Sequence, residues 1–267
     1  MDIGPHGVSD AWIEGVVRRD GHIEHRRVHG DLTFRVLTDE PEPEHSRLPV
    51  VLIHGIGMSH RYLSRLHSEL AADGPVFSID LPGYAGLPKP DRDVGVEAMA
   101  HALSQVIESL EVGAVVLVGQ SMGTQWVTDV AVQAPELVSH LVLIGPVADD
   151  DHRSFVAQMR ALTVDSIREP LDVNAIVFTD YLRCGVPWYL AQLRHMLAYR
   201  PEERLPQVSA PVLLIRGSRD SIAGVDWCRQ LRDLAGAATL VHIPGRAHNA
   251  QHSSPAAVAS AIRAHTR

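Results

Sequence analysis

The sequence has few cysteines and no long run of positive charge, and each absence excludes a class of protein. Cys184 and Cys228 are the only cysteines among 267 residues, which is too few for a disulfide framework and leaves no CxxC pair for zinc. Acidic residues outnumber basic ones, 32 to 24, and no block of Lys and Arg is long enough to track a phosphate backbone. We therefore expect no nucleic-acid partner.

The sequence also lacks the apolar segment of a signal peptide, because charged side chains interrupt its first 25 residues. We expect a cytoplasmic protein with no membrane partner. Its 16 histidines include the close pairs His25 with His29 and His248 with His252. No Cys, Asp or Glu completes a ligand set around these pairs at a recognisable spacing, so we expect no metal site and no cofactor.

The composition that remains is that of a folded domain. The apolar fraction is 45% and the mean hydropathy is close to zero. A length of 267 residues is usual for one sheet-based α/β domain with an insertion. Near the N-terminus, the segments Trp12 to Arg18, His22 to Val28 and Leu32 to Leu37 are separated by the turn dipeptides Asp-Gly and Gly-Asp. They predict antiparallel strands at a sheet edge.

From Pro49 onward, short apolar runs alternate with stretches of helical periodicity. Unbroken apolar runs are typical of strands in a parallel sheet that helices cover on both faces. The alternation predicts an α/β fold with a mostly parallel, twisted sheet. The six runs are Val50 to Ile53, Val76 to Ile79, Val115 to Val118, Leu141 to Ile144, Val212 to Ile215 and Thr239 to Ile243.

One interval, between Pro146 and Pro206, contains no credible buried strand. It carries three amphipathic stretches instead, at 155–162, 173–182 and 187–199. We interpret residues 146–206 as a helical cap (lid) inserted into a core made of residues 1–145 and 207–267.

Four loops that bear chemically active side chains follow four of the predicted strands. Open α/β sheets place their sites at the carboxyl ends of strands, so we expect these loops to meet. They are His54-Gly55-Ile56-Gly57, Gly119-Gln120-Ser121-Met122-Gly123, Arg216-Gly217-Ser218-Arg219-Asp220 and Pro244-Gly245-Arg246-Ala247-His248.

Ser121, between a strand and a helical stretch, has two interpretations. Its hydroxyl could cap the first free N–H groups of the helix. It could instead be a nucleophile, which needs a base to take its proton, and His248 is the candidate base, with Asp220 to hold one imidazole nitrogen. A cap would leave Gly119 and Gly123 unexplained, whereas a tight strand-to-helix turn requires them.

From Val50 to its end, the sequence resembles the α/β-hydrolases, and more closely the serine esterases and lipases with a small helical cap. The shared features are G-x-S-x-G, the His-Gly loop, and Ser, Asp and His in that chain order. The resemblance implies a catalytic triad of Ser121, Asp220 and His248. It also implies an oxyanion hole formed by the backbone N–H groups of Ile56 and Met122.

Alternatives remain for two members of the triad. His252 could serve as the base, although His248 directly follows the strand-end turn. The acid could come from 149–151, three aspartates that follow an earlier strand, but such a run is more typical of a solvated surface. We expect His54 to be a structural hydrogen-bonding residue beneath its loop.

The sequence departs from the family pattern at two places near the site. Thr124 stands where a further glycine is frequent. This puts a hydroxyl or a methyl group near the elbow, the tight strand-to-helix turn that carries Ser121. Residues 80–86 resemble the DxxGxG loop of the family with one residue added, a change that would reshape the pocket entrance.

The serine at position 121 favours an acyl-enzyme route and argues against the aspartyl nucleophile of related epoxide hydrolases. We expect an apolar or aromatic carboxylic ester, lactone or thioester of small or medium size. Carbon–carbon bond hydrolases share such a triad, and some proteins of this fold bind small ligands or act as lyases, so both stay as alternatives. Substrate contacts are expected from three aromatic residues of the cap: Tyr181, Trp188 and Tyr189.

Overall fold

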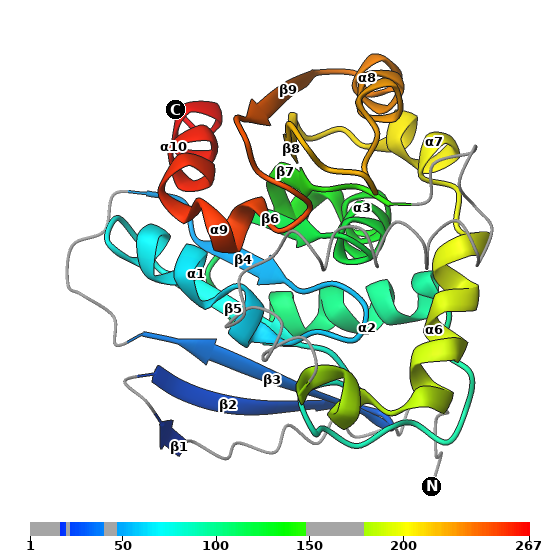
Figure 1. Ribbon diagram of the computed structural model, residues 1–267. Coiled ribbons are helices and arrows are strands. Elements are labelled where there is room, and N and C mark those ends of the chain that lie inside the picture. The colour runs from blue at the N-terminus through cyan, green and yellow to red at the C-terminus, as the bar shows by residue number, and fades with distance from the viewer. Residues whose placement is uncertain (1–16, 20–21, 40–46, 148–178) are drawn as a thin grey trace, which may run out of the picture.

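The computed structural model describes residues 17–19, 22–39, 47–147 and 179–267, which form one nine-stranded sheet flanked by helices (Figure 1). The strand order is β1-β2-β3-β5-β4-β6-β7-β8-β9. Strands β4 to β9 pair in parallel, while β1, β2 and β3 pair antiparallel and form one edge. The predicted α/β class is confirmed.

The strands lie where the apolar runs predict them, with differences of a few residues at their ends. β1 is the shortest, and residues 12–16 of the predicted first strand lie outside the described residues. The bounds are β1 Val17–Arg19, β2 His22–His29, β3 Leu32–Thr38, β4 Val50–Ile53, β5 Val76–Asp80, β6 Val115–Gln120, β7 Val138–Ile144, β8 Val212–Gly217 and β9 Ala238–Ile243.

The last strand differs from the prediction of an apolar strand covered on both faces. β9 lies at the edge of the sheet, and of its six residues only Ile243 is fully buried. An edge strand has a neighbour on one side only, so its side chains are covered less well than those of β4, β6 and β8.

The helices cover both faces of the sheet and enclose two hydrophobic cores. Helices α1 and α10 cover one face, where Leu66 and Ile262 are buried; α2, α3 and α8 cover the other, where Met99 and Trp126 are buried. The helix bounds are η1 His60–Tyr62, α1 Ser64–Ala71, α2 Val96–Glu108, α3 Gly123–Gln133, η2 Pro135–Leu137, α6 Val186–Ala198, α7 Pro201–Arg204, η4 Leu205–Gln207, α8 Val225–Leu234, α9 Ala250–Ser253 and α10 Pro255–His265.

The expected cap is described only in its second half. Residues 148–178, which include the first amphipathic stretch and part of the second, lie outside the described residues. The third stretch is helix α6, as predicted, and residues 179–184 are also helical.

Buried polar contacts attach this part of the chain to α3. The Gln125 amide donates to the Met196 carbonyl oxygen at 2.9 Å. The Asp129 carboxylate, fully buried, accepts hydrogen bonds from Tyr199 and Arg204. Because buried polar groups are costly to leave unpaired, these contacts hold α6 and α7 firmly against the core.

Among the described helices, none combines the length and the apolar character that crossing a bilayer requires.

Candidate active site

Ser121 lies at the apex of a sharp turn between β6 and α3. Its φ of +55° is in the left-handed region, which is uncommon for a residue other than glycine. From Val115 to Ala131, Ser121 is the one residue that is not fully buried. Helix α3 begins at Gly123, and Met122 is its N-cap residue. The interpretation of Ser121 as a helix cap is therefore wrong.

The two flanking glycines make this turn possible. A Cβ atom on Gly119 would lie 2.6 Å from Val127 Cγ2, and a Cβ on Gly123 would lie 2.6 Å from the His54 carbonyl oxygen. Contacts below 3 Å do not occur for real Cβ atoms, so only glycine lets β6 and α3 come this close. This is the steric reason for the G-x-S-x-G pattern, and it agrees with the prediction.

The His-Gly loop that follows β4 packs directly on the serine turn. A Cβ on Gly55 would lie 2.8 Å from Ser121 Cβ and 2.8 Å from Gln120 Oε1. His54 is buried beneath this loop, with Nδ1 2.8 Å from the Gly55 carbonyl oxygen and Nε2 3.2 Å from the Leu81 amide nitrogen. The prediction that His54 has a structural hydrogen-bonding role is confirmed.

The loop brings the backbone of Ile56 next to the serine turn. Ile56 follows Gly55 and is 5% exposed, while Met122 follows Ser121 and is fully buried. The backbone hydrogen bonds of the described loops and helix ends include none that Ile56 or Met122 donates. Both residues are buried, and each is the direct chain neighbour of a residue in the contact between Gly55 and Ser121.

Asp220 and His248 come from the loops after β8 and β9. His248 Nδ1 lies 2.9 Å from Asp220 Oδ2, and both side chains are buried. Asp220 Oδ1 accepts from the amides of Ile222 and Ala223 at 2.8 and 2.9 Å. Burial raises the pKa of Asp220, but His248 and these hydrogen bonds lower it by more, so the carboxylate is ionised at neutral pH.

The end of β7 joins the serine to the histidine. The Ser121 amide donates to the Ile144 carbonyl oxygen at 2.9 Å. The next residue, Gly145, faces the imidazole: a Cβ there would lie 2.8 Å from His248 Cε1 and Nδ1. Ser121 and the Asp220–His248 pair therefore lie beside consecutive residues at the end of β7, at the carboxyl ends of the parallel strands.

Of the two alternatives to this arrangement, one is described. The ring of His252, on α9, stacks on Tyr62 with centroids 5.7 Å apart, whereas Asp220 pairs with His248. The aspartates at 149–151 lie outside the described residues.

Comparison with known proteins identifies the family of this chain. The family model of the alpha/beta hydrolase family matches residues 50–261, most of the chain. The chain belongs to the alpha/beta hydrolase family. A solved serine hydrolase involved in carbazole degradation shares the fold, with a TM-score of 0.76 and 24% identity over 91% of this chain and 98% of that one.

Two curated relatives are similar to this chain in sequence. An uncharacterized protein of Mycobacterium tuberculosis is 28% identical over 217 residues, which cover 78% of this chain. The chain spans 60% of the length of that relative. Esterase YbfF of Escherichia coli is 24% identical over 253 residues, covering 87% of this chain and 98% of that one.

Of the three aromatic residues expected to contact substrate, Tyr181 lies on the His-Gly loop and Tyr189 packs against Tyr181. A Cβ on Gly57 would lie 2.6 Å from Tyr181 Cε1, so the tyrosine ring rests on the loop next to Ile56. Tyr181 packs edge-to-face with Tyr189, with centroids 5.0 Å apart. Tyr181 thus lies on the His-Gly loop, and Tyr189 lies beside Tyr181.

Trp188, the third aromatic residue, packs on the loop after β5 instead. A Cβ on Gly83 would lie 2.6 Å from Trp188 Cε2, and the indole meets Tyr84 edge-to-face. Trp188 is 6% exposed. The lengthened loop at 80–86 therefore contains a buried tyrosine, Tyr84, and is covered by Trp188.

Thr124, the other departure from the family pattern, turns its hydroxyl toward the backbone. Its Oγ1 donates to the Ser121 carbonyl oxygen at 2.6 Å, and its side chain is buried. The hydroxyl lies near the elbow, as expected, and braces the turn.

Sequence reasoning missed two residues that support the site. Gly145 leaves the space that the His248 ring occupies, and its φ of +59° favours glycine. Arg216 is buried and donates to the carbonyl oxygens of Asp220 and Ala223 at 3.0 and 2.9 Å, which fixes the loop that carries Asp220. The sequence does show both residues directly after predicted strands, Gly145 after 141–144 and Arg216 after 212–215, and this position could have marked them as part of the site.

Proposed function

We propose that this protein is a serine hydrolase that cleaves a small or medium carboxylic ester, lactone or thioester through an acyl-enzyme on Ser121. The observation that carries the proposal is the convergence at the end of β7. There the Ser121 amide bonds to Ile144, and Gly145 packs against His248, which is paired with Asp220. A serine held at positive φ on an accessible apex, next to a buried Asp–His pair, fits a nucleophile.

The proposed reaction starts with attack of Ser121 Oγ on the substrate carbonyl carbon. His248 Nε2 takes the hydroxyl proton as the C–O bond forms, and Asp220 stabilises the imidazolium through Nδ1. Collapse of the tetrahedral intermediate breaks the ester bond, and His248 returns the proton to the leaving oxygen. Water, activated by the same histidine, then releases the acid from Ser121.

The oxyanion of both tetrahedral intermediates needs fixed donors. We assign this role to the backbone N–H groups of Ile56 and Met122, which the packing of Gly55 on Ser121 supports. The N-terminus of α3, directly after the elbow, adds its positive dipole end. Each such donor typically lowers the barrier by about 3 kcal/mol.

The proposed acyl or alcohol pocket lies under a cap made of residues 146–206. The contact of Tyr181 with Gly57 and the pairing of Tyr181 with Tyr189 support an apolar or aromatic substrate group next to the oxyanion loop. Trp188 would act indirectly, because it packs on Gly83 and so shapes the loop at 80–86. The similarity to an esterase over nearly the whole chain agrees with ester cleavage.

The experiment compares wild type, Ser121→Ala and Ser68→Ala. Ser68 is an exposed serine on α1 and serves as the matched control. Each protein is assayed with p-nitrophenyl esters of increasing acyl length and treated with a fluorophosphonate, and the labelled peptide is read by mass spectrometry. We expect the alanine at position 121 to lower kcat by about 10⁴-fold or more and to abolish the label.

Three outcomes separate the candidates. Label on Ser121 with ester turnover supports the proposal, and the length profile measures the acyl pocket. Label without turnover of any ester would replace ester cleavage by carbon–carbon hydrolysis or a lyase reaction with the same nucleophile. Turnover that survives in Ser121→Ala would overturn the role of Ser121 and assign the reaction to another group. Neither label nor turnover in wild type would also overturn it and would favour a ligand-binding protein.

A further inference from the structure

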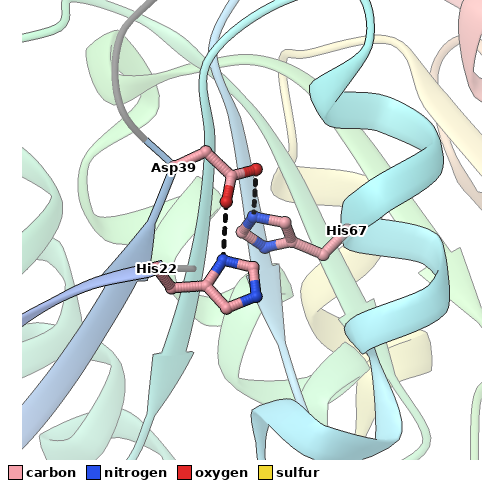
Figure 2. Close-up of side chains that lie close together, drawn as sticks. All are labelled: His22, Asp39 and His67. Carbon is pink, nitrogen blue, oxygen red and sulfur yellow. Dashed lines mark hydrogen bonds and ion pairs between the residues drawn. The ribbon is translucent and has the colours of Figure 1, made fainter. Parts of the chain in front are cut away.

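Three side chains with metal-ligating atoms meet on one side of the sheet, far from the serine. They are His22 at the start of β2, Asp39 directly after β3, and His67 on α1. Figure 2 shows the two imidazoles on the same side of the Asp39 carboxylate, with one carboxylate oxygen directed at each ring. His22 Nδ1 lies 2.6 Å from Asp39 Oδ1, and His67 Nε2 lies 3.3 Å from Asp39 Oδ2.

This cluster and the candidate active site lie at opposite ends of the strands of the sheet. Strand β3 runs antiparallel to β5, and its last residue, Thr38, pairs with Phe77 near the start of β5. Asp39 therefore lies at the amino ends of the parallel strands, whereas Ser121 and His248 follow carboxyl ends. Any ligand bound here is separate from the reaction proposed above.

The donor set selects a class of metal ion. Two imidazoles and one carboxylate suit zinc, copper, nickel or non-haem iron, while magnesium and calcium prefer oxygen ligands alone. The ligand atoms of His22, Asp39 and His67 all lie within 4.8 Å of one another. Around a tetrahedral zinc ion, neighbouring ligand atoms lie about 3.3 Å apart. The pair formed by His67 and Asp39 already has this spacing at 3.3 Å.

The ligand atoms of the two histidines lie within 4.8 Å of each other. The pair formed by His22 and Asp39 can reach the zinc spacing because both side chains have room to move. Their side chains are 30% and 38% exposed, and a separation of 2.6 Å needs to open by only about 0.7 Å to suit the metal. His67, by contrast, is held in place: its side chain is buried, and its Nδ1 lies 2.8 Å from Ser78 Oγ on β5. Metal-binding histidines typically use their second ring nitrogen in this way.

We propose that His22, Asp39 and His67 form a binding site for one divalent ion of the zinc class, with a water molecule completing the coordination. The site links the start of β2 and the end of β3, which form one hairpin, to α1, which lies more than 20 residues further along the chain. A bound ion would therefore tie the antiparallel edge of the sheet to the parallel core. The histidine pairs that sequence spacing suggests, His25 with His29 and His248 with His252, take no part in it.

The test uses the full chain, purified without a polyhistidine tag and freed of metal with a chelator. Isothermal titration with Zn²⁺ is expected to show one tight site per chain, and Zn²⁺ is expected to raise the melting temperature. Bound Co²⁺ is expected to show the visible absorption of a low-symmetry site with nitrogen and oxygen ligands.

The variants His22→Ala and Asp39→Asn test the assignment, with His25→Ala as the matched control. His25 is three positions along β2 and so on the other face of the strand. The first two variants are expected to weaken Zn²⁺ binding by 10-fold or more and to lose the zinc-dependent rise in melting temperature, while the control keeps both.

Either of two results would overturn the site. One is wild-type protein with no stoichiometric Zn²⁺ binding, which would leave Asp39 as a hydrogen-bond acceptor between two histidines. The other is binding that His22→Ala and Asp39→Asn leave unchanged, which would place the metal elsewhere. Ester hydrolysis by His22→Ala is expected to match wild type, so this outcome is independent of the proposed function.

Discussion

Ser121 has a backbone conformation that is unfavourable in free energy for a residue with a side chain. A left-handed conformation costs a residue with a Cβ atom about 1–2 kcal/mol. The turn keeps it there because Gly119 and Gly123 pack tightly on either side, and because the Ser121 carbonyl oxygen accepts from the Thr124 hydroxyl. The strain holds the hydroxyl at an accessible apex, where a relaxed helix cap would have turned it toward the backbone.

Asp220→Asn tests the orientation of the proposed base at the same scale. The amide oxygen of the asparagine can still accept from Ile222 and Ala223, so the loop should fold as in wild type. The amide nitrogen, however, cannot accept from His248 Nδ1, which favours the wrong tautomer. We expect kcat to fall roughly 10⁴-fold with little change in KM.

Steady-state kinetics with a p-nitrophenyl ester would measure both constants, and Asp226→Asn, an exposed residue of α8, provides the control. Activity near the wild-type value in Asp220→Asn would transfer the role of the acid to the aspartates at 149–151.

At the scale of elements, the loop after β4 and the turn after β6 must be positioned against each other. A Cβ on Gly55 would meet Ser121 Cβ and Gln120 Oε1, both at 2.8 Å. Gly55→Ala is therefore expected to push the loop, and with it the Ile56 amide, away from the serine turn. A displacement of about 1 Å in a catalytic group can cost about 100-fold in rate, so we expect kcat to fall by about that factor.

Gly236→Ala is the matched control for this prediction, because a Cβ at that position has no neighbour within 4 Å. Kinetics and thermal unfolding of both variants would separate a local displacement from a loss of folding. Unchanged kcat in folded Gly55→Ala would argue that the loop does not supply an oxyanion donor.

At the scale of the whole molecule, stability depends on pH through a buried ion pair that joins distant elements. Asp80, at the end of β5, accepts from His60 Nδ1 at 2.7 Å and from Arg35 on β3 at 3.2 Å. Burial raises the pKa of Asp80, but His60 lowers it by more, to about 2. Burial lowers the pKa of His60, but Asp80 raises it by more, to above 6.5.

The two shifts define a window of maximum stability. The contribution of Asp80 is full above its unfolded pKa of 3.8 and is lost as the pH falls toward 2. The contribution of His60 is full below its unfolded pKa of 6.5 and is lost as the pH rises through its folded value. The pair therefore contributes most between about pH 4 and 6.5.

His60→Gln tests the alkaline side of this window. Urea midpoints measured across a pH series should decline above pH 6.5 in wild type, and the decline should be smaller in the variant. His101→Gln, which changes an exposed histidine on α2, should keep the wild-type slope. An identical alkaline decline in wild type and His60→Gln would show that the pair does not control it.

The positions of most strands along the chain could be predicted from the sequence, because strands covered on both faces must be apolar without interruption. It also identified Ser121, Asp220 and His248 as candidates, because chemistry restricts such loops to a few residue types at strand ends. Both patterns involve residues that are close together in the sequence, so they can be recognised without knowing the fold.

Which of these residues lie together could be learned only from the folded chain. Asp220 pairs with His248 across two adjacent strands, and Gly145 makes room for the imidazole from a third. His22, Asp39 and His67 lie far apart in the sequence, with no regular spacing, and meet because β3 runs antiparallel to β5 beneath α1. Strand pairing determines such contacts, and it depends on the packing of the whole sheet.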